Sequence, residues 1–177
     1  MKASVYIATS LDGFIAREDG SLDWLPGSEG GGDEDYGYQA FMDSVDVLVM
    51  GRNSYEMVLS FGEWPYGDKR VVVLSRTLTE LADHLPQTVE LSAASPAVLV
   101  AELESSGAKH LYIDGGKVIQ SFLKAGLIQE LIITKIPVLI GPGLPLFGPL
   151  DQDMALRHIE TKSFESGLVQ SRYEVLT

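Results

Sequence analysis

The sequence lacks cysteine, which excludes disulfide bonds, thiolate nucleophiles, iron–sulfur clusters and cysteine-based zinc sites. It also lacks any apolar run close to the ~20 residues that a membrane-spanning helix requires. The amino-terminal residues form a strand-like run and show no long apolar secretion signal. We therefore expect a cytoplasmic protein, and the length of 177 residues predicts a single domain over residues 1–177.

Basic residues are also scarce, since 13 Lys and Arg accompany 25 Asp and Glu and give a formal net charge of −12. A nucleic-acid-binding protein needs a basic face to displace counterions, so this function class is excluded. Lys2 and Arg17 are the only basic residues among the first 50, which carry ten acidic ones. This acidic part either is a solvated surface that aids solubility or marks where an anionic ligand binds poorly.

Several familiar catalytic patterns are missing as well. The sequence has no G-x-S-x-G motif, which argues against a serine hydrolase of that type. The Gly-Pro-Gly at residues 141–143 is a poor dinucleotide fingerprint, because its prolines prevent the helix that should follow. No metal site is predicted, because no metal-ligand spacing surrounds His84, His110 or His158.

Short apolar runs rich in β-branched residues predict the strands. Two of them, at residues 46–50 and 71–74, are apolar at consecutive positions, which is typical of strands buried on both faces of a sheet. Near the carboxy terminus, two strand-like segments flank Glu165-Ser-Gly167, a hairpin signal. The predicted strands cover residues 5–9, 45–50, 70–75, 110–114, 131–136, 158–164 and 168–176.

Helical patterns alternate with these strands. The clearest spans residues 95–106, with Ser95 as N-cap and Pro96 at the first helical position. Its predicted apolar face consists of Val98, Leu99 and Leu103. The other predicted helices cover residues 36–44, 54–61 and a segment after Gly115-Gly116 whose apolar stripe is Val118, Ile119, Phe122 and Leu123. This alternation predicts an α/β fold with a mixed, mostly parallel sheet and an antiparallel carboxy-terminal hairpin.

Three junctions that follow buried strands carry residues suited to phosphate binding. They are Gly51-Arg52-Asn53-Ser54, Leu74-Ser75-Arg76 and Asp114-Gly115-Gly116-Lys117. In an open α/β sheet, ligands bind at the carboxyl ends of the strands, where helix N-termini direct free N–H groups outward. Glycine lets the backbone approach a pyrophosphate, and arginine suits a phosphomonoester. Together the junctions predict a phosphate-binding edge.

These same residues resemble the dihydrofolate-reductase-like superfamily along nearly the whole chain. The segments at residues 50–56, 73–76 and 112–118 are similar to its cofactor turns. The motifs Ser-Leu-Asp-Gly-Phe-Ile-Ala at residues 10–16 and Pro-Val-Leu-Ile-Gly-Pro-Gly-Leu-Pro-Leu-Phe at residues 137–147 are more similar to the reductase domain of the bifunctional riboflavin-biosynthesis deaminase–reductase. The resemblance implies a three-layer fold, with helices on both faces of the sheet, and NADPH-dependent hydride transfer to a nitrogen heterocycle or an imine.

The resemblance also implies roles for individual residues. For the phosphates of NADPH these are Gly51, Arg52, Asn53 and Ser54, with Leu74, Ser75 and Arg76 at the adenosine 2′-phosphate. For the pyrophosphate and nicotinamide they are Asp114, Gly115, Gly116, Lys117, Val118 and Ile119, with Ala8, Thr9 and Ile15 facing the nicotinamide. For the substrate they are Ser10, Trp24, Tyr36 and Phe41, although Trp24 equally suits an aromatic staple for the following loop. The riboflavin-type relatives are dimeric, so a homodimer is expected.

The acid that would assist protonation is ambiguous. Residues 26–35, rich in Gly and acids, predict a mobile loop that is either inert or a lid, and Glu29, Asp33, Glu34 and Asp35 all lie in it. We favour Asp35, which would also cap the following helix; a cap without a catalytic role is the alternative. Asp12 is a second candidate, although Asp12-Gly13 also suits a plain turn.

One departure from the riboflavin-type pattern concerns the substrate. Those reductases carry a lysine shortly before Ser-Leu-Asp-Gly, and here that position falls at Tyr6. A phosphorylated substrate would meet an acidic amino-terminal third, where like charges repel. The reduction of the riboflavin-pathway aminopyrimidine and of dihydrofolate are the two reactions to test. A non-catalytic NADPH sensor and an α/β scaffold that binds no nucleotide are the alternatives.

Overall fold

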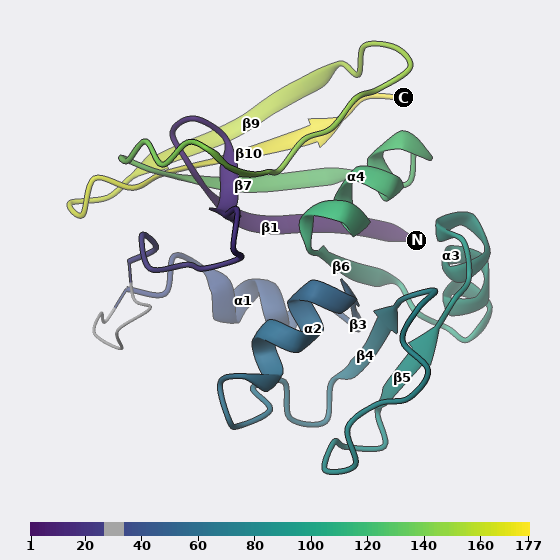
Figure 1. The fold of residues 1–177 in the computed structure, drawn as a ribbon. Coiled ribbons are helices and arrows are strands. Elements are labelled where there is room, and N and C mark those ends of the chain that lie inside the picture. The colour runs from purple at the N-terminus through teal and green to yellow at the C-terminus, as the bar shows by residue number, and fades with distance from the viewer. Residues whose placement is uncertain (27–33) are drawn as a thin grey trace.

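One mixed sheet of eight strands runs through the molecule (Figure 1). The computed structural model describes residues 1–26 and 34–177. Neighbouring strands pair in parallel from β5 through β7, whereas β10 pairs antiparallel with both β7 and β9. From one edge to the other the order is β5 (Val89–Ser92), β4 (Arg70–Leu74), β3 (Val47–Gly51), β6 (His110–Asp114), β1 (Lys2–Ser10), β7 (Glu130–Ile136), β10 (Val169–Val175) and β9 (Leu156–Ser163). The predicted α/β class, with its carboxy-terminal antiparallel hairpin, is confirmed.

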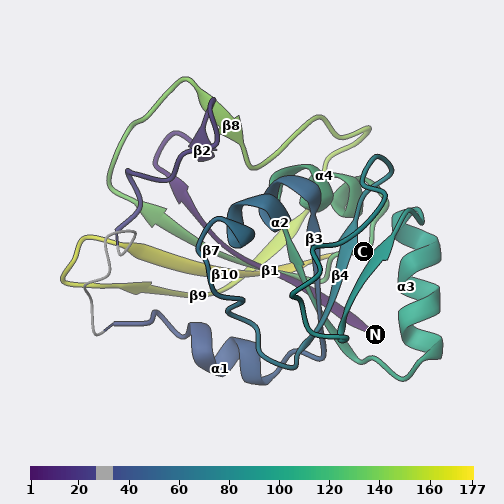
Figure 2. The same cartoon turned by 60° about the horizontal axis from the view of Figure 1, so that its bottom comes forward.

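A two-stranded antiparallel sheet and four helices complete the described fold. The small sheet joins β2 (Phe14–Arg17) to β8 (Gly143–Pro145) and lies on the opposite side of the molecule from α1 in Figure 2. The helices are α1 (Tyr38–Asp43), α2 (Arg52–Leu59), α3 (Pro96–Ser105) and α4 (Gly116–Lys124). None of them is long and apolar enough to cross a membrane.

The two faces of the central sheet bury separate apolar clusters. Leu111 and Ile113 of β6 pack with α3 and α4, whereas Tyr112 between them packs with α1 on the other face. This alternation is the two-residue period of a strand, so helices cover both faces. The consecutive apolar runs of β3 and β4 are buried on both sides, with Val71, Val72 and Val73 fully inaccessible. The three-layer arrangement is therefore confirmed.

The helix boundaries follow the predicted signals with two corrections. Ser95 caps α3 by accepting a hydrogen bond from the Val98 N–H at 3.5 Å. The side chain of Val98 itself is half exposed, so its predicted place on the buried face is wrong, because the stripe centres on Leu99 and Leu103. The helix predicted at residues 36–44 begins at Tyr38, because Tyr36 has a φ of 56°, in the left-handed region.

Three short strands escaped the sequence analysis, and part of one predicted loop lies outside the described residues. Strands β2, β5 and β8 have only three or four residues, too few to show a hydrophobic period. Residues 27–33, including Glu29 and Asp33, lie outside the described residues, and with them most of the loop predicted at residues 26–35.

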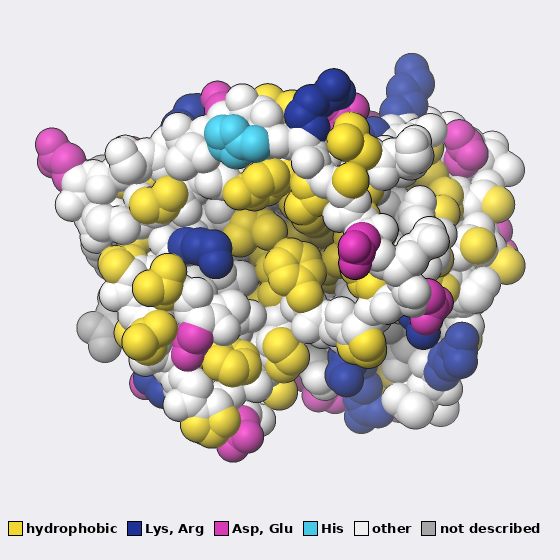
Figure 3. Space-filling model, turned by 90° about the horizontal axis from the view of Figure 1, so that it is seen from above, with side chains coloured by type: hydrophobic (Ala, Val, Ile, Leu, Met, Phe, Trp, Pro, Cys, Tyr) yellow, Lys and Arg dark blue, Asp and Glu magenta, His cyan; other side chains and the backbone are white. Residues whose placement is uncertain are grey.

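Apolar side chains remain exposed along the carboxy-terminal part of the chain. The view from above in Figure 3 shows hydrophobic groups gathered around a hollow. The homodimer expected from the resemblance stays a prediction. The large ones among residues 139–176 are Leu139, Leu144, Phe147, Leu150, Leu156, Ile159, Val169 and Leu176.

The two neighbouring residues on α3 provide a test of this packing. Leu99 is 2% exposed and Val98 is 50% exposed. Leu99→Ala should lower the free energy of unfolding by about 2–5 kcal/mol, because it leaves a cavity in the core. Val98→Ala should change it by no more than about 0.5 kcal/mol. Urea denaturation measures both, and similar losses for the two variants would contradict the described helix face.

Candidate functional site

The structure brings the three sequence-predicted turns together at one edge of the sheet. Strands β4, β3 and β6 are adjacent and parallel, with Gly51 opposite Leu74 and Met50 opposite Asp114. The turns that follow these strands therefore leave the sheet side by side at its carboxyl edge. This is the edge at which open α/β sheets bind ligands.

Contacts between the turns are close enough to require glycine. A Cβ atom on Gly115, whose φ is +94°, would lie 2.7 Å from the Ser54 Oγ atom. One on Gly51 would lie 2.9 Å from a methyl group of Val118. The starts of α2 and α4 can approach each other this closely only because both glycines lack side chains.

Two helix N-termini at this edge have no side-chain cap. Helix α2 begins after Gly51 and α4 begins after Gly115, and neither N-cap residue accepts a hydrogen bond through a side chain. Helix α3, in contrast, is capped by the Ser95 hydroxyl. The first N–H groups of α2 and α4 are therefore left for solvent or for an anion, and the helix dipoles favour an anion there.

The two arginines at this edge differ in their surroundings. Arg52 donates from Nε to Glu56 Oε1 at 2.8 Å and from Nη1 to Thr77 Oγ1 at 3.1 Å, which links α2 to the turn after β4. Ser75 in that turn accepts hydrogen bonds from the N–H groups of Thr77 and Leu78. The exposed Arg76 has no ion-pair partner in the described part of the chain. Arg76 is thus the more available cation.

The end of β1 supplies an unpaired polar group. Thr9 is 2% exposed, and its hydroxyl has no hydrogen-bond partner among the described residues. The next residue, Ser10, accepts a hydrogen bond from the Phe14 N–H at 3.0 Å. Ile15 of β2 lies over the start of α4, because a Cβ atom on Gly116 would be 2.8 Å from the Ile15 Cδ1 atom. A buried hydroxyl without a partner calls for a ligand or a water, and here it lies near these turns.

Asp114 is the half-buried acid of this edge. Its Oδ1 atom accepts a hydrogen bond from the Gly115 N–H at 2.9 Å. Burial raises the pKa of Asp114 to about 6, because desolvation disfavours the carboxylate more than this hydrogen bond stabilises it. Burial, followed by the charge of Asp114, in turn raises the pKa of Tyr38 to about 12 and that of Tyr66 further. The sequence analysis placed Asp114 in a cofactor turn and missed its acidity; the one signal was a carboxylate directly after a buried strand.

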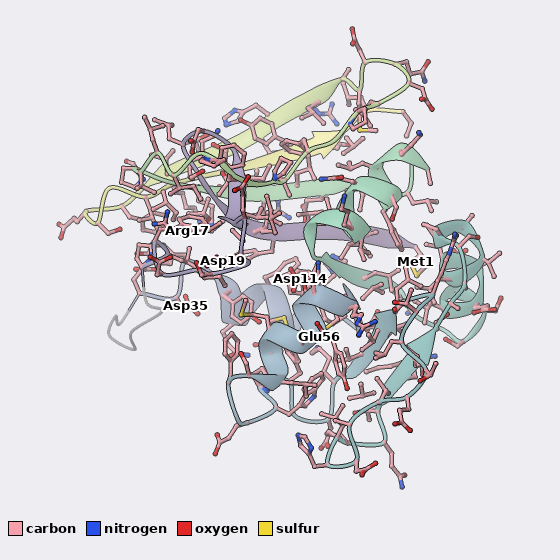
Figure 4. The ribbon with its side chains drawn as sticks, in the orientation of Figure 1. Met1, Arg17, Asp19, Asp35, Glu56 and Asp114 are labelled. Carbon is pink, nitrogen blue, oxygen red and sulfur yellow. The ribbon has the colours of Figure 1, made fainter. Side chains whose placement is uncertain are left out.

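The predicted catalytic acids have other partners. The Asp35 carboxylate accepts hydrogen bonds from the N–H groups of Gly37 at 3.0 Å and Gln39 at 3.2 Å. It therefore stabilises the start of α1 from two residues before the N-cap, which is Gly37 and not Asp35 as predicted. The Asp12 carboxylate accepts hydrogen bonds from the N–H groups of Gly141 at 2.9 Å and Ile140 at 3.3 Å. Figure 4 shows Asp114 near the middle of the molecule and Asp35 toward one side. A catalytic role for Asp35 or Asp12 stays a prediction, and both side chains have a structural role.

The predicted substrate residues fall in two groups. Phe41 is buried and stacks on Tyr6, with ring centroids 5.0 Å apart. Tyr36 turns away toward the β9–β10 hairpin, where its ring meets Phe164, and its carbonyl oxygen accepts a hydrogen bond from the Tyr6 hydroxyl at 2.5 Å. The indole N–H of Trp24 is buried without a partner among the described residues. Only Phe41 therefore belongs to the aromatic group that surrounds Tyr6.

A cleft of about 400 Å³ lies between α1 and the strands β7, β10 and β9, and Tyr6, Tyr36 and Phe41 all line it. The carboxylate of Glu130, which lines this cleft, already has partners within the protein. Glu130 accepts hydrogen bonds from the Ser4 hydroxyl at 3.0 Å and from Arg172 Nε at 2.7 Å, and it pairs with Lys2 at 3.1 Å. The cleft thus differs in kind from the turn edge, where N–H and hydroxyl groups are unpaired.

The fold defines the class of protein: a dihydrofolate-reductase-like α/β domain. Residues 2–170 match the family described as the RibD C-terminal domain. The chain therefore belongs to the RibD C-terminal reductase domain family.

Individual relatives agree with this membership. The uncharacterized protein YwjB of Bacillus subtilis (strain 168) is 39% identical over 165 residues, 92% of each chain. A crystal structure from Shewanella sp. PV-4, provisionally described as a riboflavin biosynthesis protein, is 44% identical, matches 100% of both chains and has a TM-score of 0.93. The deaminase/reductase of Thermotoga maritima has a TM-score of 0.72 at 15% identity over 99% of this chain and 56% of its own, a likeness of fold alone.

The raised pKa of Asp114 predicts a pH-dependent effect on stability. Between about pH 4 and pH 6 the folded state keeps a proton on Asp114 that the unfolded state loses, so this group lowers stability as the pH rises through that window. Asp114→Asn should therefore raise the free energy of unfolding by about 1–3 kcal/mol near pH 7.5 and have little effect near pH 3.5.

Urea denaturation of wild type and variant at both pH values measures the difference. Asp83→Asn removes the same charge from an exposed loop residue and should show no comparable gain. An equal gain for Asp114→Asn at both pH values would contradict the raised pKa.

Proposed function

We propose that this protein is an NADPH-dependent reductase that transfers hydride to the carbon of a C=N or C=O bond in a small heterocycle. The observation that carries the proposal is the convergence of three turns at one sheet edge, with two uncapped helix N-termini and an unpaired arginine. A dinucleotide phosphate needs this combination of N–H groups and fixed cations. Membership of the RibD reductase domain family supports the same cofactor.

The residues present fit NADPH as a bound group. The edge offers uncapped N–H groups at residues 52–54 and 116–118 for the phosphates, and Arg76 for the 2′-phosphate. The buried Thr9 hydroxyl, without a partner, is a hydrogen-bonding group for the nicotinamide end. When bound, NADPH supplies the hydride. The protein supplies orientation, an effect worth up to ~7–11 kcal/mol of the barrier in favourable cases.

Asp114 is the residue of this chain that handles a proton at the edge. With a pKa of about 6, its carboxyl group can both donate and accept a proton near neutral pH. Its hydrogen bond from the Gly115 N–H fixes the orientation of one oxygen and leaves the other available. We assign to Asp114 the hydrogen bond to the substrate nitrogen that the sequence analysis had assigned to Asp35 or Asp12.

Two acceptors test the enzyme proposal. The motifs at residues 10–16 and 137–147 favour the riboflavin-pathway aminopyrimidine, and the absence of a lysine at Tyr6 disfavours it relative to dihydrofolate. Oxidation of NADPH, followed by its absorbance with each compound, measures turnover. A non-catalytic NADPH sensor is the second candidate, because the carboxylates of Asp35 and Asp12 are both occupied by backbone N–H groups. Tight NADPH binding without turnover of any acceptor would favour the sensor.

Arg76 provides a direct test of the cofactor. Arg76→Gln should weaken NADPH binding by about ten- to a hundredfold, because a charged hydrogen bond contributes ~1.5–3 kcal/mol, and should leave NADH binding unchanged. Arg70→Gln is the matched control, because Arg70 begins the same strand at its other end and pairs with Glu90 at 3.0 Å. Fluorescence titration measures all four affinities. Equal losses for NADPH and NADH would place the 2′-phosphate elsewhere.

Gly115 tests the contact between the turns. Gly115→Ala would place a Cβ atom against the Ser54 hydroxyl, separate the starts of α2 and α4, and weaken NADPH binding by about tenfold or more. Gly126→Ala is the control, since Gly126 also has a positive φ but has nothing within 4 Å of the added atom. Both variants should lose ~1–2 kcal/mol of stability through backbone strain, whereas only Gly115→Ala should bind NADPH less tightly. Unchanged binding by Gly115→Ala would contradict the proposed site.

A further inference from the structure

We propose that the acceptor of this reductase carries no phosphate and is a flat nitrogen heterocycle, uncharged or cationic, that lies against the rings of Tyr6, Tyr38 and Tyr66 beside Asp114. These four residues are called the phenol–carboxylate surface. The inference rests on the proposed reductase function and names its substrate class. It departs from the acceptor named for the Thermotoga maritima relative, which is a phosphoribosyl compound.

Geometry brings the members of the phenol–carboxylate surface to one side of the sheet. The rings of Tyr6 and Tyr38 meet edge to face, with centroids 5.7 Å apart. The hydroxyl of Tyr112 donates to the Tyr6 carbonyl oxygen at 3.1 Å, which joins β6 to β1 beneath the rings. Asp114 follows Tyr112 by two positions on β6, so its side chain leaves the same face. Tyr66 packs against this apolar cluster and meets Trp64 at 5.2 Å.

The electrostatic character of this surface is acidic. Asp114 is its one charged member, and no cation lies within ion-pair distance of it in the described part of the chain. The charges of Asp35 and Glu34 also reach Tyr6, whose pKa is raised by burial first and by these two acids to a smaller extent. A phosphate dianion placed here would meet like charges in a partly desolvated environment, which is unfavourable.

Three basic side chains on the α1 side of the sheet are already occupied. Lys69 donates two hydrogen bonds from Nζ, to the Met42 carbonyl oxygen at 2.8 Å and to the Val45 carbonyl oxygen at 2.5 Å. Lys2 and Arg172 in the neighbouring cleft both pair with Glu130. A phosphate ester would have to displace one of these partners and leave a carbonyl or a carboxylate unpaired.

The unoccupied cations lie elsewhere. Among the described residues, four basic side chains have no acidic or carbonyl partner: Arg76, Lys109, Lys117 and Lys135. Arg76 and Lys117 are at the cofactor edge, in the turn after β4 and in the first turn of α4. Lys109 precedes β6 at the opposite end of that strand from Asp114. Lys135 is the register partner of Thr9 and projects from the Thr9 face of β7. This face is opposite to that of its neighbour Thr134, which bonds Gln170 close to Tyr6.

This distribution assigns the phosphates to the cofactor and a phosphate-free ring to the acceptor. Aromatic rings beside a carboxylate suit a planar ring with N–H donors, and they stabilise a cation more than an anion. In the reaction, hydride adds to the carbon of the C=N bond and the π electron pair moves to nitrogen. An uncharged imine then takes one proton, from Asp114 or water, whereas an iminium ion becomes a neutral amine without one.

Binding of a matched pair of compounds tests the inference. The probes are 5-amino-6-(5-phosphoribosylamino)uracil and the same compound after removal of its phosphate, each titrated calorimetrically into protein saturated with NADP⁺. We expect the phosphate-free compound to bind more tightly by about tenfold, since removing one repulsive charge contact changes affinity by roughly that factor. Asp114→Asn should lower the ratio of the two affinities, because it removes the charge that repels the phosphate. Asp83→Asn, which removes the same charge at an exposed loop, should leave this ratio unchanged.

The outcomes separate this inference from the proposed function. Tighter or equal binding of the phosphate ester overturns the phosphate-free acceptor, and so does failure of both compounds to bind protein that holds NADP⁺. Failure of the protein to bind NADP⁺ or NADPH at all overturns the reductase proposal itself. The wild type and Asp114→Asn can also prefer the phosphate-free compound by the same factor. That result overturns the role given to Asp114.

Discussion

The parallel pairing of β4, β3 and β6 is the constraint on which the rest of the candidate site depends. Because the three strands point the same way, the turns after Gly51, Leu74 and Asp114 must open at one edge. Each turn by itself is an ordinary strand–helix connection. Side by side they place two helix N-termini and two arginines at the same edge, and the missing side chains of Gly51 and Gly115 let the helices meet. The chemistry proposed for this edge thus follows from strand direction before it follows from any single residue.

The distribution of charge divides the candidate site into a cationic part and an acidic, aromatic part. The edge formed by the turns after β3, β4 and β6 carries uncapped N–H groups and cations, which suit an anion. On the other side, Asp114 sits among tyrosines, where burial raises its pKa and where Lys69 is held by carbonyl oxygens. A site that binds an anionic ligand next to a less polar ring benefits from this division, because the carboxylate of Asp114 repels the anion from the place of the ring.

Most of the fold could be predicted from the sequence because its signals are local. The consecutive valines of β4 indicated a strand buried on both faces, and Ser95-Pro96 fixed the start of α3. The turns at Gly51 and Gly115 were found in the same way, as glycine after a β-branched run. The misplaced Val98 shows the limit of such signals, since a neighbour of two buried residues can still fall just outside their stripe.

The roles of the acids could not be predicted because they depend on distant partners. Asp12 is held by backbone N–H groups 128 and 129 positions further along the chain. Burial raises the pKa of Asp114, and no local sequence pattern predicts that this side chain is buried. Asp35 was expected to cap a helix, yet the left-handed backbone of Tyr36 that delays this helix shows no signal in the sequence. Sequence reasoning could group the turns of this edge from local patterns, but it could not foresee the backbone partners of Asp12 or the burial of Asp114.

The position of β1 has a consequence for how the chain must fold. This first strand lies between β6 and β7, so its partners are about a hundred or more residues away. During synthesis, β1 has no strand to pair with until residues 110–136 have left the ribosome. The hydroxyl of Thr9 can be buried only after that pairing. Such long-range pairing slows folding, because a large loop must close before the strand gains its hydrogen bonds. A nascent chain that stops short of β7 therefore leaves β1 without one of its two neighbours and its apolar side chains exposed.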